Sequence, residues 1–219
     1  MPGYELIGKE ERKEVNKVFL EGGILFRQGF EKLRKSYKVL EFEKKFAKYM
    51  NTNYALAVTS GTAALRVALA ALNLKDGDEV ITQSFTFVAT VEAIVEARLK
   101  PVCCDVDKTL NMSPQKLKKL INKKTKAIIV VHMLGVSPHM REIIKICKKR
   151  KIAIIEDTAW GCGGYYNNKH LGTLGRIGTF SFDFAKSITT GEGGMVVFKK
   201  EKDFLTAKAW HDHGHENNP

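Results

Sequence analysis

The fold of this chain is constrained most by an alternation that starts at residue 54, between short apolar, β-branched runs and longer segments with helical spacing. Such an alternation is typical of βα units around a mostly parallel sheet. The predicted strands are 54–58, 79–82, 101–106, 126–133, 152–158, 177–184 and 194–198. The predicted helices are 61–72, 86–97, 113–121, 137–150 and one that begins near residue 202. The sequence therefore predicts an α/β fold.

The chain divides into three predicted parts. Residues 1–36 form an N-terminal arm with one helix near 9–20, and residues 37–200 form a large domain that opens with a helix at 39–50. Residues 201–219 are the incomplete start of a C-terminal part, because the helix near 202 is followed by no further element. We therefore expect the chain to be a fragment of a longer protein.

The formal net charge of +12 raises the question of nucleic-acid binding. The lysines are dispersed over segments such as 118–126 and 145–151, and runs of this kind usually form solvated helix faces. They are accompanied by no helix-turn-helix, zinc-finger or RNP pattern, so we expect no nucleic-acid partner. A positive surface is better suited to attracting an anionic small-molecule substrate.

The composition, 44% apolar and 27% charged, is that of a soluble globular protein. The longest apolar runs, such as 127–131, are far shorter than a membrane span, and no apolar run follows a basic N-terminus. The four cysteines lack C-x-x-C spacing and are expected to be small buried side chains in a reducing compartment. We expect a cytoplasmic protein that makes no membrane contact.

Three strand ends carry polar groups that a single ligand could use. Residues 60–63, Ser-Gly-Thr-Ala, open a helix whose free N–H groups and hydroxyls favour a phosphate. Asp157 closes one buried strand, and Lys186 follows another, just before a glycine-rich turn. Each feature alone is typical of an N-cap, a loop hydrogen bond or a solvent-facing lysine. Together they supply a phosphate cradle, a carboxylate and an amine, the three groups that pyridoxal 5'-phosphate requires.

Six segments then resemble the DegT/StrS family of sugar aminotransferases, which are fold-type I pyridoxal phosphate enzymes. They are SGTAAL, SFTFVATVEAI, VHMLG, EDTA, GTLGRIGTFSF and KSITTGEGGM. The resemblance covers essentially the whole chain. It implies a three-layer α/β/α large domain with a mostly parallel, mixed sheet that binds the cofactor, the family's C-terminal small domain being absent. It also implies a homodimer.

The resemblance implies a role for each matching residue. Lys186 would be the lysine that forms the imine with the cofactor, and Asp157 would pair with the pyridine nitrogen. The phosphate would be bound by the 60–63 loop and by one further hydroxyl, that is by Ser60, Gly61, Thr62, Ala63 and Ser181. Phe87 falls where the family stacks an aromatic ring on the cofactor, a use that is compatible with core filling.

Two positions depart from the family pattern. Trp160 stands where glutamine or histidine commonly hydrogen-bonds the ring hydroxyl of the cofactor, and an indole can donate but not accept. Stacking remains available to it. Arg176 replaces the aspartate that usually precedes the strand at 177, which leaves substrate binding and a purely structural role both open.

The implied activity is the transfer of an amino group from a donor, expected to be L-glutamate, to a keto-sugar for cell-surface polysaccharide or lipopolysaccharide synthesis. Lys186 favours amination, because related dehydratases carry histidine there. Residues 1–11, 25–30 and 212–215 resemble the branch that aminates an 8-keto octulosonate, and nucleotide-linked keto-hexoses remain open. The alternative is a truncated, non-catalytic protein that binds cofactor or a partner.

Two histidine-containing segments could have roles other than cofactor binding. Residues 211–216, His-Asp-His-Gly-His-Glu, alternate groups that can ligate zinc or nickel. The resemblance makes this segment a loop of a metal-free enzyme, so we expect no metal site. His132 follows a buried strand and is expected to be structural, with a place in the cofactor pocket left open.

Overall fold

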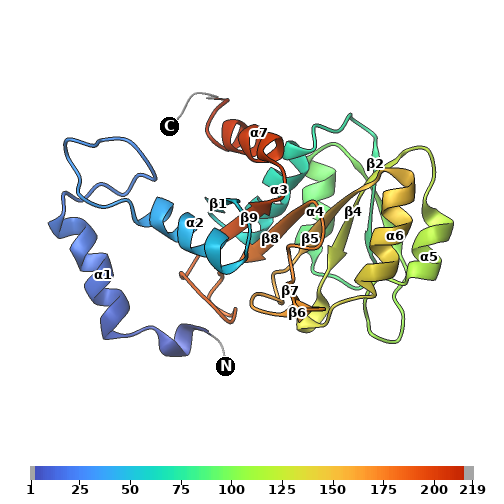
Figure 1. Ribbon diagram of the computed structural model, residues 1–219, viewed down its shortest axis with the longest axis horizontal. Coiled ribbons are helices and arrows are strands. Elements are labelled where there is room, and N and C mark those ends of the chain that lie inside the picture. Colours follow the sequence, from blue (N-terminus) through green and yellow to red (C-terminus); the bar gives the residue numbers. More distant parts are fainter. Residues whose placement is uncertain (1–2, 215–219) are drawn as a thin grey trace.

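A computed structural model describes residues 3–214, and its centre is a seven-stranded sheet (Figure 1). The strand order is β1-β9-β8-β5-β4-β2-β3. Only β9 runs antiparallel to its neighbours, whereas β8, β5, β4, β2 and β3 pair in parallel. The strands are β1 (Tyr54–Val58), β2 (Glu79–Gln83), β3 (Lys100–Cys104), β4 (Thr125–Val131), β5 (Ala153–Asp157), β8 (Ile177–Ser181) and β9 (Gly194–Phe198). The predicted mostly parallel, mixed sheet is confirmed.

Helices cover both faces of the sheet and complete the three layers. One face carries α3 (Gly61–Ala71), α4 (Val88–Glu96) and α7 (Glu201–His211), and the other carries α2 (Lys38–Tyr49), α5 (Pro114–Leu120) and α6 (Met140–Arg150). Side chains alternate between the two cores along each strand. In β4, Ile129 joins the α3 side and Ile128 the α6 side. Burial of both faces explains why the strands read as continuous apolar runs.

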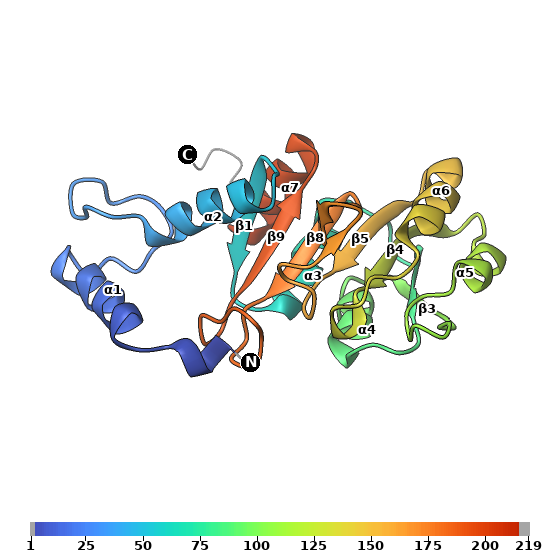
Figure 2. The same cartoon turned by 60° about the horizontal axis from the view of Figure 1, so that its bottom comes forward.

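The N-terminal segment is much less integrated into the body. It consists of a short 3₁₀ helix, η1 (Gly3–Leu6), and α1 (Lys9–Leu20), which has no buried residue. Figures 1 and 2 both show α1 standing away from the sheet and its helices. The following loop is fastened to α2 by Arg27, whose guanidinium donates two hydrogen bonds to Glu43, at 2.7 and 2.8 Å.

Several predicted boundaries were wrong by a few residues. Strand β4 ends at Val131 rather than 133, and α6 begins at Met140 rather than 137, because Pro138 disfavours helical backbone in the residue before it. The predicted strand 177–184 ends at Ser181. A hairpin, β6 (Tyr165–Tyr166) with β7 (Lys169–His170), was not predicted.

Two negative observations hold for residues 3–214. None of their helices combines the length and apolar character that crossing a bilayer requires. All four cysteines are free thiols. Cys104 and Cys147 are buried as expected, whereas the expectation was wrong for Cys103, which is exposed, and Cys162 is half-buried.

Candidate functional site

A cavity of about 390 Å³ opens at the carboxyl edge of the parallel strands. Its walls come from the N-termini of α3 and α4, the end of β5, and the loop that joins β8 to β9. In a parallel α/β sheet this is the edge where ligands bind. All the predicted site residues except Ala63 line it, namely Ser60, Gly61, Thr62, Phe87, Asp157, Trp160, Ser181 and Lys186.

The first wall is the N-terminus of α3. Ser60 caps the helix, its Oγ accepting a hydrogen bond of 3.0 Å from the Ala63 N–H. That bond uses the backbone group of Ala63, whereas helix geometry leaves the N–H groups of Gly61 and Thr62 without an intrahelical acceptor. Gly61 lies so close to the end of β8 that an added Cβ would sit 2.8 Å from Cβ of Ser181. Free N–H groups and the Ser181 hydroxyl therefore meet at one corner of the cavity.

Asp157 forms the floor, at the last position of β5. Its side chain is buried, and Oδ2 accepts a 2.9 Å hydrogen bond from Thr90 Oγ1 while Oδ1 accepts a 3.2 Å bond from the Ala159 N–H. Burial raises the pKa of this carboxyl, against the opposing effects of the two hydrogen bonds and of nearby His132 and Lys186. A cationic ligand group would relieve that desolvation cost directly.

Lys186 enters the cavity from the loop after β8. Its Nζ lies 3.7 Å from the ring centroid of Trp160, a cation–π contact. Desolvation lowers the pKa of the amine, and the carboxylates of Asp183 and Asp157 oppose that shift. The amine is thus biased toward the neutral, nucleophilic form by burial.

Thr90 is a site residue that the sequence reasoning did not identify. It lies on α4, 67 residues from Asp157 in the chain, and is fully buried. Its hydroxyl also lies 2.9 Å from that of Thr86, another lining residue. A helical threonine that faces the core gives no sequence signal of a carboxylate partner.

His132 lies beneath the site rather than in its lining. Its Nε2 is 2.7 Å from Oε2 of Glu156, and both side chains are fully buried. Glu156 also accepts hydrogen bonds from the N–H groups of Gly172 and Gly175, at 2.9 and 2.5 Å. The structural role expected of His132 matches this pairing, which ties the end of β4 to the turn before β8.

Arg176 lies at the opposite end of β8 from the cavity. Its guanidinium donates two hydrogen bonds, of 2.7 and 2.6 Å, to the carboxylate of buried Asp203 in the first turn of α7. Arg176 therefore fastens α7 to the sheet. Of the two roles that the sequence left open, the structure supports the structural one.

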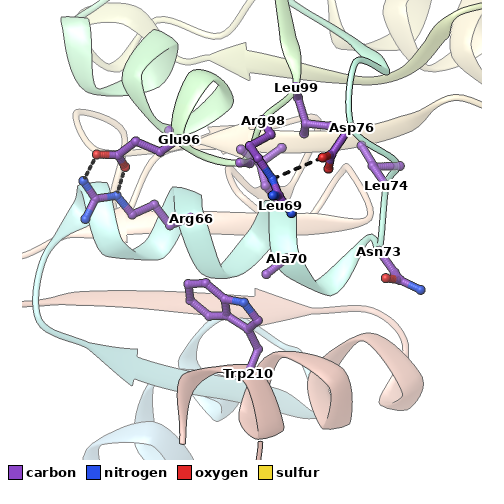
Figure 3. A pocket seen from close by; sticks show the side chains of 12 residues that line it. Arg66, Leu69, Ala70, Asn73, Leu74, Asp76, Glu96, Arg98, Leu99 and Trp210 are labelled. Carbon is purple, nitrogen blue, oxygen red and sulfur yellow. Dashed lines mark hydrogen bonds and ion pairs between the residues drawn. The ribbon is translucent and has the colours of Figure 1, made fainter. Parts of the chain in front are cut away.

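A second cavity of about 390 Å³ lies on the outer side of α3 and α4, where α7 approaches them. Figure 3 shows its charged side chains turned toward each other, Arg66 toward Glu96 and Arg98 toward Asp76. Trp210 of α7 also lines this cavity. These guanidinium groups already have carboxylate partners. The cavity at the strand ends, where groups of different chemistry converge, is the better candidate site.

Within the part of the chain that the structure describes, no three histidine, cysteine or acidic side chains are grouped as metal ligands. Two residues of the 211–216 segment, His215 and Glu216, lie outside the described residues.

Comparisons with known proteins agree with the resemblance. A GDP-perosamine synthase of Escherichia coli O157:H7 is 41% identical over 187 residues, which is 80% of this chain and 51% of that protein. An aminotransferase structure from Psychrobacter cryohalolentis superposes with a TM-score of 0.89 at 35% identity, covering 95% of this chain and 51% of that one. A GDP-4-keto-6-deoxymannose-3-dehydratase with a trapped PLP-glutamate geminal diamine gives 0.86 at 31% identity, covering 97% and 55%.

The chain spans about half the length of the curated relatives it matches. Residues 7–219 match the model of one family, so the match takes in nearly the whole sequence. The chain belongs to the DegT/DnrJ/EryC1/StrS aminotransferase family.

Proposed function

We propose that this chain carries the cofactor-binding part of a pyridoxal phosphate-dependent aminotransferase, which moves an amino group from L-glutamate to a keto-sugar for polysaccharide or lipopolysaccharide synthesis. The observation that carries the proposal is the meeting, in one cavity, of the Lys186 amine, the buried Asp157 carboxylate and the N-terminus of α3. Family membership supports it, as does the PLP–glutamate species named for the related dehydratase.

The residues present fit pyridoxal 5'-phosphate. The close approach of Gly61 to Ser181 leaves room for no side chain at the helix N-terminus, so backbone N–H groups can contact a phosphate directly. Asp157, whose pKa is raised by burial, is suited to a protonated pyridine nitrogen as its partner. Trp160 and Phe87 offer aromatic faces on the cavity wall, which suits a planar ring.

The cofactor, when bound, supplies an electron-withdrawing ring that stabilises negative charge on the carbon beside the reacting nitrogen. Asp157 would keep the ring nitrogen protonated. Lys186 would supply the amine that holds the cofactor and, once released, would act as general base and acid, carrying one proton between two carbons. Burial lowers the pKa of Lys186, which is the direction that this role requires.

The substrate class follows from charge and from the lysine itself. The net charge of +12 favours an anionic sugar, either nucleotide-linked or an octulosonate acid. Lys186, rather than a histidine, favours amination over dehydration. We propose further that residues 1–36 are an arm, 37–200 the cofactor-binding large domain and 201–219 the start of another part, and that the protein is a homodimer.

The proposal is tested by trapping the bond to Lys186. The purified chain is soaked in pyridoxal 5'-phosphate, reduced with borohydride and mapped by peptide mass spectrometry. We expect an adduct on Lys186 that Lys186→Ala abolishes. Lys199→Ala is the matched control, because Lys199 is another lysine whose pKa is lowered by burial but does not line the cavity.

A second stage separates catalysis from binding. Adding L-glutamate to the loaded protein should release one equivalent of 2-oxoglutarate, and a panel of keto-sugars should then identify the acceptor. An adduct without 2-oxoglutarate would favour the non-catalytic, cofactor-binding alternative. No adduct on Lys186 would overturn the proposed function altogether.

A further inference from the structure

The segment that carries Lys186 is held at its base by its own hydrogen bonds. Phe182 donates from N–H to the Gly193 carbonyl at 2.9 Å, and its own carbonyl accepts a 3.0 Å bond from the Thr190 N–H. These bonds pair the two arms of the loop where it leaves the sheet. At the tip, the N–H groups of Ala185 and Lys186 donate to Asp183, at 3.1 and 3.0 Å, and further contacts come from elsewhere in the molecule.

One such contact comes from the first described residue of the chain. The N–H of Gly3 donates a 2.7 Å hydrogen bond to the carbonyl of Lys186. Gly3 is buried, although the rest of the arm up to residue 16 is exposed. In Figure 2 the dark-blue η1 lies beside the loop between β8 and β9.

The packing around Gly3 is so tight that a side chain would require the loop backbone to shift by a few tenths of an ångström. An added Cβ would sit 3.0 Å from the carbonyl oxygens of both Lys186 and Ser187, and 3.1 Å from the Thr189 nitrogen. Next to it, the Tyr4 ring lies 6.1 Å from that of Phe184, centroid to centroid. The N-terminal 3₁₀ helix therefore contacts the loop on both sides of Lys186.

We propose that Gly3 is a positioning residue for Lys186, and that η1 straps the loop so that the amine stays over Trp160 and beside Asp157. This role of Gly3 rests on the proposed role of Lys186. The carbonyl that Gly3 binds and the side chain of Lys186 share one Cα, so movement of the carbonyl also moves the stem of the amine. The 183-residue separation in sequence makes this a long-range contact between the start of the chain and its reactive nitrogen.

The test compares Gly3→Ala with Gly8→Ala in the untagged protein. Gly8 is the matched control, because it belongs to the same arm and an added Cβ would meet only the Leu6 carbonyl, at 4.0 Å. Both changes are made in a Trp210→Phe background, which leaves Trp160 as the single tryptophan. Its fluorescence then reports the contact with Lys186, and hydrogen exchange reports the loop.

For Gly3→Ala we expect exchange of the amides at 183–190 to rise at least tenfold, a changed Trp160 emission, and cofactor trapping on Lys186 slowed about tenfold. The urea midpoint should match that of the parent, since α1 and η1 contribute almost nothing to the core. Gly8→Ala should leave all four measurements unchanged. Unaltered exchange and emission in Gly3→Ala would overturn the inference, as would a lowered urea midpoint with faster exchange throughout.

A second pair of variants tests the same contact in case Gly3→Ala does not fold. Tyr4→Ala removes the ring contact with Phe184 and should loosen the same amides, whereas Leu6→Ala, an exposed neighbour, should not. Exchange and fluorescence need no cofactor. If the parent formed no trapped adduct the proposed function would fail, while these two measurements would still decide whether Gly3 holds the loop.

Discussion

At the scale of single residues, burial disfavours the charged forms of both Asp157 and Lys186. Burial raises the pKa of the carboxyl and lowers that of the amine, and each charge is one of the effects that opposes the other's shift. Burying these two groups therefore costs free energy, and a ligand with a cationic ring and a carbonyl would offset that cost. We expect this arrangement to lower the stability of the ligand-free chain.

This predicts that Asp157→Asn stabilises the ligand-free chain at neutral pH. Because burial raises the pKa of Asp157 in the folded state, protonation of its carboxyl stabilises the fold. This stabilisation is complete below the pKa of the unfolded state and is lost as pH rises through the pKa of the folded state. The asparagine side chain is uncharged at every pH, so the variant does not lose stability in this way. We expect urea denaturation to show a gain of about 1 kcal/mol at pH 7, shrinking toward pH 4.

Asp105→Asn is the control, because that carboxyl is largely exposed and its ion pair with Lys116 lies at the surface. Trapping on Lys186 should fall in Asp157→Asn, since the ring nitrogen loses its partner. A variant less stable than the parent at neutral pH would show that Asp157 is well solvated or well paired in the fold.

The sequence was informative about residues at strand ends and uninformative about their partners. Asp157 and Lys186 could be read because a polar group directly after a buried strand must lie at the sheet's carboxyl edge. Thr90 and Gly3 could not, because their contacts join segments 67 and 183 residues apart and depend on how helices pack. The pairing of Arg176 with Asp203 could not be predicted for the same reason.

At the scale of elements, β1 and β9 have the predicted bounds, whereas several other predicted boundaries were wrong. The interior of β4 is fixed by five consecutive buried residues, but its end is set by a backbone turn at Leu134, which adopts a left-handed conformation. The β6–β7 hairpin was missed because it depends on two adjacent asparagines, Asn167 and Asn168, with positive φ. That pair fits a tight hairpin turn, which apolar periodicity does not report.

The attachment of α7 gives a prediction at this scale. Arg176→Ala leaves the buried carboxylate of Asp203 without its two charge-assisted hydrogen bonds. Breaking a fully buried pair costs about 3–5 kcal/mol, and because about a third of the arginine side chain is exposed we expect about 2 kcal/mol. Urea unfolding at pH 7 measures the loss.

Arg98→Ala provides the comparison, because the pair it breaks with Asp76 is mostly exposed and should contribute less than about 1 kcal/mol. Trapping of cofactor on Lys186 should be unchanged in both variants, since both arginines lie outside the cavity. Equal losses in the two proteins would mean that the Asp203 pair is no stronger than a surface ion pair.

At the scale of the whole molecule, the sheet and its two helix layers form one body from which the arm projects (Figure 2). The α7 helix packs against that body, with Ala207 fully buried in the core to which α3 and α4 contribute. The arm carries large apolar side chains that the described part of the chain does not cover: Leu6, Phe19, Leu20, Leu25 and Phe26. Five exposed apolar side chains on one segment make the arm a candidate interaction surface.

The proposed homodimer supplies a partner for that surface. Burying one large apolar side chain contributes about 1.5–3 kcal/mol, so replacing both Phe19 and Leu20 by glutamate should weaken dimerisation by well over tenfold. Sedimentation velocity over a concentration series measures it. Val95→Glu, at an exposed position of α4 in the body, should dimerise like the parent. A parent chain that stays monomeric at every concentration, or a double variant that dimerises normally, would remove the arm from the interface and leave its contact with the Lys186 loop as its one assigned role.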